Sequence, residues 1–142
     1  MRIAIINGPN LNLLGRREPH IYGSQSFEDY FVGLIAAFPG AHLSYFQSNG
    51  EGALIDRLQD CMATADGVVI NPGGYAHTSV ALADAISASG LPVVEVHISN
   101  IAAREHFRHH SYTAARCIGT ISGLGLDGYA LAVRHLLSHH NP

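Results

Sequence analysis

The segment Arg2-Ile3-Ala4-Ile5-Ile6 sets the fold class of this chain. It is mostly apolar, rich in β-branched side chains, and does not alternate between apolar and polar positions. A strand with this pattern is buried on both faces, as happens in a parallel sheet that helices cover on each side. The opening segment therefore predicts an α/β protein.

Four more short apolar runs follow, and segments of helix length separate most of them. The further runs lie at residues 41–46, 67–70, 92–96 and 117–121, and the segments with helical spacing lie at 26–38, 52–64, 78–89 and 128–140. Ser26 with Asp29 resembles a capping box at the start of the first helix. Strands that alternate with helices indicate a parallel sheet, and five strands favour the flavodoxin-like order 2-1-3-4-5. We expect a three-layer sandwich that forms one catalytic domain over residues 1–142.

The basic residues exclude several kinds of chemistry. All eight are arginine, so a lysine Schiff base, a phosphate-loop lysine and pyridoxal-phosphate attachment are impossible. The net charge of −3 gives no basic field for nucleic acid. No apolar run approaches the roughly 20 residues of a membrane span. We expect neither nucleic acid nor a membrane as a partner.

The surface composition points to self-association. Charged residues make up 13% of the chain, whereas about 25% is usual. We therefore favour a homo-oligomer that hides part of its surface over a monomer with a Ser, Gly and His surface. Cys61 and Cys117 match no metal or redox spacing. With no secretory signal, they indicate reduced cysteines in a cytoplasmic protein.

The fold predicts where a ligand binds. In such sheets ligands lie outside the carboxyl ends of the strands, near the switch point between the first and third strands. The connection after the first strand, residues 7–23, is much longer than usual and carries Arg17 and Tyr22. It is either a functional lid or an ordered surface loop in which Tyr22 packs as a plug.

Polar groups also follow the third strand. Asn71 and His77 could hydrogen-bond substrate hydroxyls, and amides at a helix start near Thr78 could face an anion. The alternative is turn chemistry with helix capping, which we favour for Thr78 and Ser79.

The fourth strand ends on Glu95-Val96-His97. Residues two apart share one side of a strand, so the Glu95 carboxylate is placed to orient the His97 imidazole and stabilise its protonated form. Beyond them, His106 and His110 would stand one turn apart if the segment were helical, a spacing that zinc uses. The chain lacks an H-E-x-x-H pattern and a nearby cysteine pair, so we expect no metal.

These loops resemble those of type II 3-dehydroquinate dehydratase over residues 3 to about 137. The segments that carry the resemblance are Gly8-Pro9-Asn10-Leu11-Asn12-Leu13-Leu14-Gly15, Arg17-Glu18-Pro19, Ile21-Tyr22-Gly23, Phe46-Gln47-Ser48-Asn49, Asn71-Pro72-Gly73, His77-Thr78-Ser79, Glu95-Val96-His97-Ile98-Ser99-Asn100 and Phe107-Arg108-His109-His110-Ser111-Tyr112. The resemblance implies a shikimate-pathway enzyme that dehydrates 3-dehydroquinate to 3-dehydroshikimate. The implied reaction is an anti elimination through an enolate, without an imine, a cofactor or a metal.

The resemblance also implies a role for each matching residue. The catalytic roles fall to Tyr22 as proton acceptor, Arg17 as transition-state stabiliser, His97 as proton donor, Glu95 as the orienter of His97, and Asn10 as the holder of a water on the enolate oxygen. The binding roles fall to Asn71, His77 and Arg108 for substrate hydroxyls, Ile98 and Ser99 for the carboxylate through their amides, and Asp84 for a neighbouring subunit's site. The implied assembly is a homododecamer, a tetramer of trimers.

The chain departs from the family at a few positions. Gly50 stands where His is common, Ala83 where Arg commonly precedes the Asp, and Gly74 and Ala76 where Ala and Thr are frequent. None of these changes removes a catalytic role. Two other functions stay open on the residues alone: a flavodoxin-like module that binds a nucleotide or flavin without catalysis, and a metal-dependent hydrolase that uses the histidine cluster.

Overall fold

A single five-stranded parallel sheet forms the centre of the molecule in the computed structural model, which describes residues 1–16, 20 and 24–140. The strands are β1 (Arg2–Asn7), β2 (His42–Gln47), β3 (Gly67–Asn71), β4 (Val93–His97) and β5 (Gly119–Ser122). They pair in the order β2-β1-β3-β4-β5, every pair parallel. The predicted fold class and strand order are confirmed.

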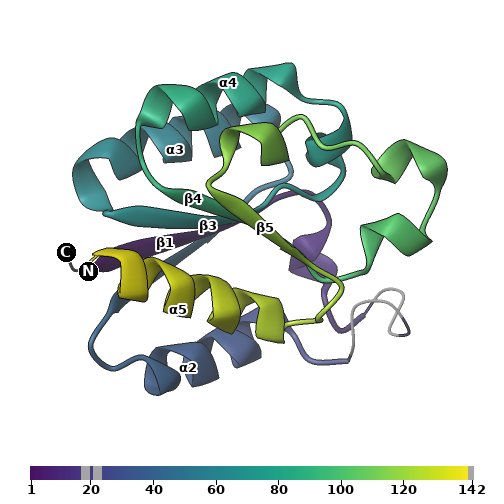
Figure 1. Ribbon diagram of the computed structural model, residues 1–142. Helices are drawn as coiled ribbons and strands as arrows, with labels where there is room; N and C mark the ends of the chain where they lie inside the picture. The colour runs from purple at the N-terminus through teal and green to yellow at the C-terminus, as the bar shows by residue number, and fades with distance from the viewer. Residues whose placement is uncertain (17–19, 21–23, 141–142) are drawn as a thin grey trace.

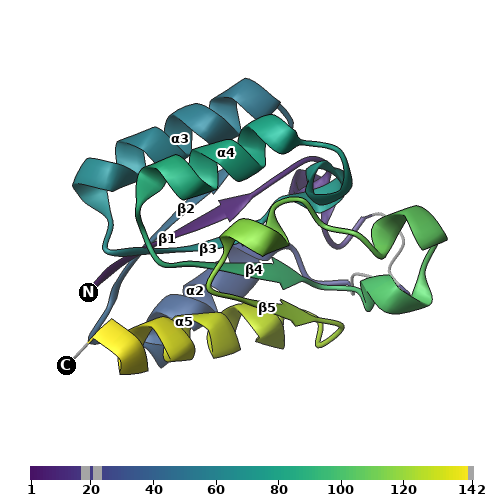
Figure 2. The same ribbon diagram turned by 45° about the horizontal axis from the view of Figure 1, so that its top comes forward.

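Helices cover both faces of this sheet, as Figures 1 and 2 show. The helices are α2 (Phe27–Ala37), α3 (Glu51–Thr64), α4 (Val80–Ser89) and α5 (Asp127–His140). Strand β1 serves both layers, because Ile3 and Ile5 pack in the core with α2 and α5, whereas Ala4 and Ile6 pack in the core with α3 and α4. A strand buried on both faces leaves its carboxyl end as the place where polar groups can meet a ligand.

Serine side chains cap the starts of helices α2 and α4. Ser26 Oγ accepts a hydrogen bond from the Asp29 amide (3.2 Å), the contact that the capping pattern predicts. Helix α4 begins at Val80, two residues later than the predicted 78–89 helix. The reason is that the amides of Thr78 and Ser79 both donate to the Tyr75 carbonyl of the preceding 3₁₀ turn η2 (Gly73–His77). The Thr78 and Ser79 amides are therefore used within the turn and are not offered to an anion, and the favoured prediction of turn chemistry with capping by Ser79 is confirmed.

The connection between β4 and β5 contains short turns and no α-helix. Residues 98–118, all of them described, form three short 3₁₀ turns: η3 (Ile101–Ala103), η4 (His106–Arg108) and η5 (Ala114–Arg116). Asn100 Oδ1 accepts from the Ala102 amide and Ser111 Oγ from the Ala114 amide. Such local side-chain bonds to the backbone compete with an α-helix. The turns η3 and η4 stand beyond the carboxyl ends of the strands, whereas η5 lies against α4 just before β5 (Figure 1).

None of the described helices combines the length and the apolar character that a membrane crossing requires.

Candidate active site

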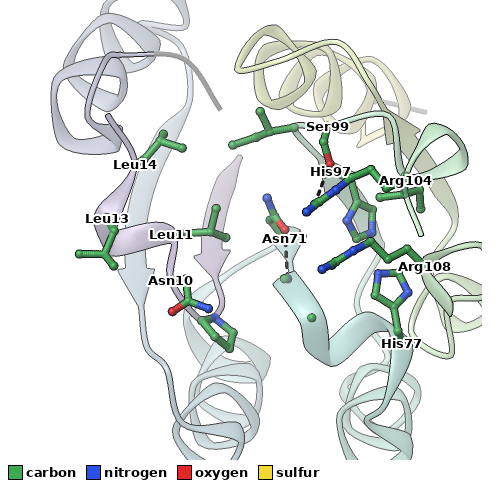
Figure 3. A pocket seen from close by; sticks show the side chains of 15 residues that line it. Asn10, Leu11, Leu13, Leu14, Asn71, His77, His97, Ser99, Arg104 and Arg108 are labelled. Atoms are coloured by element: carbon green, nitrogen blue, oxygen red, sulfur yellow. Dashed lines mark hydrogen bonds between the residues drawn. The ribbon is translucent and has the colours of Figure 1, made fainter. Parts of the chain in front are cut away.

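A cavity of about 130 Å³ opens at the carboxyl ends of β1, β3 and β4. The loops that follow these three strands line it, and Figure 3 shows their side chains pointing into one space. The predicted site residues that it brings together are Asn10, Asn71, His77, His97, Ile98, Ser99 and Arg108. The site therefore lies where the fold places ligands, at the switch point of the sheet.

The innermost polar pair is formed by the last residues of β4. The Nε2 atom of His97 lies 2.8 Å from Oε2 of Glu95, and both side chains are buried, at 7% and 1% exposure. A carboxylate only accepts, so Nε2 of His97 carries the proton of this bond and Nδ1 is left for a ligand. The contact expected from the two-residue spacing is present.

Two hydroxyls complete the surroundings of the Glu95 carboxylate. Ser111 Oγ donates to Oε2 (2.8 Å), and Thr113 Oγ1 donates to Oε1. Burial alone would raise the pKa of Glu95, but the bonds from His97, Thr113 and Ser111 outweigh it and hold that pKa below its ordinary value. The carboxylate is therefore ionised at neutral pH and accepts the Nε2 proton of His97.

His77 presents a different kind of imidazole. Its Nδ1 lies 2.8 Å from the His110 carbonyl oxygen, which can only accept, so Nδ1 carries the proton. Burial lowers the pKa of His77, and the nearby charges of His97 and Arg108 lower it further, although the bond to His110 opposes them. The ring is thus neutral at pH 7, with Nε2 as an acceptor that suits a substrate hydroxyl.

The Asn10 backbone is held in an uncommon conformation. Its φ of 70° lies in the left-handed region, where non-glycine residues seldom occur. The Asn10 amide donates to Asn49 Oδ1 (3.0 Å), which also accepts from Gln47 Nε2 (3.1 Å). Asn49 further accepts from Tyr75 on the β3 loop through its own carbonyl (2.7 Å). The turn after β2 therefore ties together the loops after β1 and β3.

These two loops also touch directly through glycine. The Gly8 amide donates to the Asn71 carbonyl (2.8 Å), and a Cβ on Gly8 would stand 2.5 Å from the Pro72 carbonyl oxygen. Gly73 has φ of 59° and approaches Pro9 from the other side. Only glycine at position 8 allows this close backbone contact.

Arginine side chains form the cationic wall of the cavity. Arg108 pairs with Glu105 through its Nε atom, and Arg104 Nη1 lies 3.4 Å from Ser99 Oγ (Figure 3). Arg104 was not among the predicted site residues, although it lines the cavity. Its position in the loop after β4, four residues before Arg108, is the signal that could have found it. Two guanidinium groups suit an anionic or hydroxyl-rich ligand.

Among the described residues, two of the predicted site residues, Glu95 and Asp84, do not line this cavity. Asp84 is exposed on α4 and does not line it. Arg17 and Tyr22 lie outside the described residues.

The zinc interpretation finds no geometry to support it. Among the described residues, no group of three His, Cys, Asp or Glu side chains could hold a metal ion. His106 belongs to η4, which ends before His110, so the two do not share a helical face.

The chain is similar in sequence to known proteins. The family model described as dehydroquinase class II matches residues 1–137. A 3-dehydroquinate dehydratase of Aliarcobacter butzleri is 52% identical over 143 residues, which cover 99% of this chain and 87% of that protein. A catabolic 3-dehydroquinase 1 of Aspergillus terreus is 54% identical over 136 residues, which cover 94% and 90%.

Solved structures agree with these sequence matches. The type II dehydroquinase of Butyrivibrio crossotus superposes with a TM-score of 0.92 at 46% identity, over 96% of this chain and 97% of that one. A 3-dehydroquinate dehydratase-like protein of Bifidobacterium longum is more distant, with a TM-score of 0.68 and 29% identity over 98% and 99%.

Proposed function

Because the chain belongs to the class II dehydroquinase family, we propose that it dehydrates 3-dehydroquinate to 3-dehydroshikimate by anti elimination through an enolate. The observation that carries the proposal is the buried His97–Glu95 pair at the cavity that the β1, β3 and β4 loops enclose. It supplies a proton donor beside groups that can hold a polyhydroxylated anion. The chain contains no lysine, so its side chains offer no amine for an imine with the substrate ketone.

The first step removes a proton from the carbon beside the ketone. We assign this step to Tyr22 from the motif resemblance, since it lies outside the described residues. A free tyrosine has a pKa near 10, so forming its phenolate at pH 7 costs about 4 kcal/mol. Arg17, assigned in the same way, offsets part of that cost because a nearby guanidinium favours the phenolate and stays protonated. The electron pair of the broken C–H bond moves into the enolate, and the proton goes to Tyr22.

The second step expels the hydroxyl group. The enolate electrons form the new carbon–carbon double bond as the C–O bond breaks, and His97 gives its proton to the departing oxygen, so that water leaves. The carboxylate of Glu95 stabilises the protonated imidazole before transfer. Asn10, held at the cavity by Asn49, would keep a water on the enolate oxygen.

The remaining cavity groups bind the substrate. His77, Asn71 and Arg108 are assigned to its hydroxyls, and the amides of Ile98 and Ser99 to its carboxylate. The neutral His77 ring and the cationic side chain of Arg108 agree with those roles.

The proposed assembly is a cytoplasmic homododecamer, a tetramer of trimers, in which Asp84 reaches the site of a neighbouring subunit. Exposed apolar side chains support an assembly that covers part of this surface, among them Val80 at 56% exposure, four residues before Asp84 on α4, and Ile118 at 56%. Ala83, where an arginine is common in the family, removes one possible partner of that contact. Light scattering of the purified protein would give the mass of the assembly.

The mechanism can be tested with 3-dehydroquinate that carries deuterium in one known orientation at the carbon beside the ketone. We expect loss of the hydrogen anti to the departing hydroxyl and retention of the other. Loss of the syn hydrogen would contradict the proposed elimination.

Tyr22→Phe tests the assignment of the base. This variant should lose turnover while keeping product binding largely intact, and an unchanged kcat would exclude Tyr22 as the base.

A further inference from the structure

Two asparagines end neighbouring strands beneath the cavity. Asn7 of β1 and Asn71 of β3 are paired in register, so their side chains project from the same face of the sheet. Both are buried, with exposures of 0% and 3%. Burying a carboxamide in an apolar core is costly unless it is hydrogen-bonded, so each of them requires a partner on the side that α5 covers.

Tyr129 is that partner. It stands in the first turn of α5 and is fully buried. Its hydroxyl donates to Asn7 Oδ1 (2.8 Å) and accepts from Asn71 Nδ2 (2.9 Å). Burial raises the pKa of Tyr129 far above its ordinary value, so the group stays a phenol with one proton to donate. This single hydroxyl joins α5 to both central strands.

The direction of these bonds fixes the orientation of the Asn71 carboxamide. Because the hydroxyl donates its one proton to Asn7, it can only accept a hydrogen bond from Asn71. This places Nδ2 of Asn71 on the Tyr129 side. On the other side, Asn71 Oδ1 accepts from the Gly73 amide (3.1 Å). If the carboxamide were flipped, its Nδ2 donor would point at the Gly73 amide, which is also a donor. One N–H and one lone pair of Asn71 are left over for the cavity that it lines.

We propose that Tyr129 is a positioning residue, which holds the Asn71 carboxamide in the one orientation that can bind a substrate hydroxyl. This inference rests on the proposed function, because it needs Asn71 to be a substrate ligand. Tyr129 touches Asn7 and Asn71 and does not line the cavity, so it acts through Asn71 and not on the substrate.

The kinetic test compares Tyr129→Phe with the wild type on 3-dehydroquinate. We expect KM to rise about tenfold, which corresponds to about 1.4 kcal/mol, with a smaller change in kcat. Tyr30→Phe is the matched control, because it removes a buried hydroxyl from the same aromatic cluster, with ring centroids 6.1 Å apart. It should leave both constants within twofold of the wild type.

A double-mutant cycle separates positioning from general destabilisation. Once Asn71 is alanine, Tyr129→Phe should add no further rise in KM, since interacting residues are not additive. A full additional rise would show that Tyr129 acts elsewhere and would overturn the inference. Thermal unfolding of every variant shows whether it is folded at the assay temperature.

Asn7→Ala tests the same series of hydrogen bonds from the Asn7 side. It can be used if Tyr129→Phe does not fold. It frees the Tyr129 proton, which can then be donated to Asn71 and weaken the preference for one orientation, so KM should again rise. A folded Tyr129→Phe or Asn7→Ala variant with wild-type KM overturns the inference and leaves the proposed function standing. A folded wild type without turnover overturns the proposed function first, and the inference with it.

Discussion

His97 Nε2 and Glu95 Oε2 lie 2.8 Å apart at the end of β4, and water is nearly excluded from both. Two further hydrogen bonds stabilise the Glu95 carboxylate, because the hydroxyls of Ser111 and Thr113 both donate to it. Glu95 therefore has three donors and remains charged inside the protein. This arrangement makes His97 the group in the cavity that is best placed to give a proton to a leaving oxygen.

The first prediction concerns this pair. Glu95→Gln replaces an acceptor with a carboxamide that can present an N–H to His97 and so impose the wrong tautomer. We expect kcat to fall by about 10²- to 10⁴-fold, the usual range for loss of a general acid or its orienter. Steady-state kinetics check this, with the exposed Glu28→Gln of α2 as a control that should keep full activity. A Glu95→Gln enzyme with normal kcat would remove the pair from the mechanism.

A second prediction concerns the contact between the β1 and β3 loops. Gly8→Ala places a Cβ against the Pro72 carbonyl, and such overpacking against backbone costs about 1–3 kcal/mol. We expect a lower free energy of unfolding in urea and reduced kcat/KM, since the two loops carry Asn10 and Asn71. Gly74→Ala is the matched control, because a Cβ there meets nothing within 4 Å. Equal stability of the two variants would contradict the tight contact.

A third prediction concerns Asn49, whose side-chain oxygen holds the Asn10 amide and Gln47. Asn49→Ala should lower stability by about 0.5–1.5 kcal/mol, because it removes the acceptor of two exposed hydrogen bonds, and should lower kcat through misplaced Asn10. Asn49→Asp keeps an acceptor oxygen and should recover most of the loss. Stopped-flow or steady-state kinetics together with urea unfolding distinguish the two. Wild-type behaviour in Asn49→Ala would show that Asn10 needs no such support.

The fourth prediction concerns pH. The pKa of His77 is lowered in the folded protein, chiefly by burial, so the unfolded chain binds that proton more readily. The contribution of His77 to the free energy of unfolding is therefore fully present above the pKa of an unfolded histidine, about 6.5. It is lost as the pH falls from that value through the lower pKa of the folded state. His77→Gln should show a shallower loss of the free energy of unfolding between about pH 7 and pH 5 than the wild type. An unchanged or steeper loss would contradict a neutral His77.

The sequence predicted those features that depend on local pattern. The apolar run at residues 2–6 indicated a strand buried on both faces, and the two-residue spacing of Glu95 and His97 placed their side chains together; the structure contains both features. Helix starts and turns were less predictable, because α4 begins only after the Thr78 and Ser79 amides are taken by Tyr75.

Contacts between distant positions could not be read from the chain. Tyr129 lies 58 residues from Asn71 and 122 from Asn7 in the sequence, and no local pattern connects them before α5 packs on the sheet. The contact between Asn49 and Asn10 is likewise long-range, since 39 residues separate them in the sequence. The roles of Tyr22 and Arg17 remain predictions from the motif resemblance.

The central claim is that this cavity dehydrates 3-dehydroquinate, and turnover by the purified wild-type protein tests it most directly. With a chelator present and no added cofactor, mixing with 3-dehydroquinate should produce the ultraviolet absorbance of a conjugated enone at a rate proportional to protein concentration, and His97→Ala should lower that rate by about 10²- to 10⁴-fold. No absorbance change from a folded sample, or full activity in folded His97→Ala, would contradict the account.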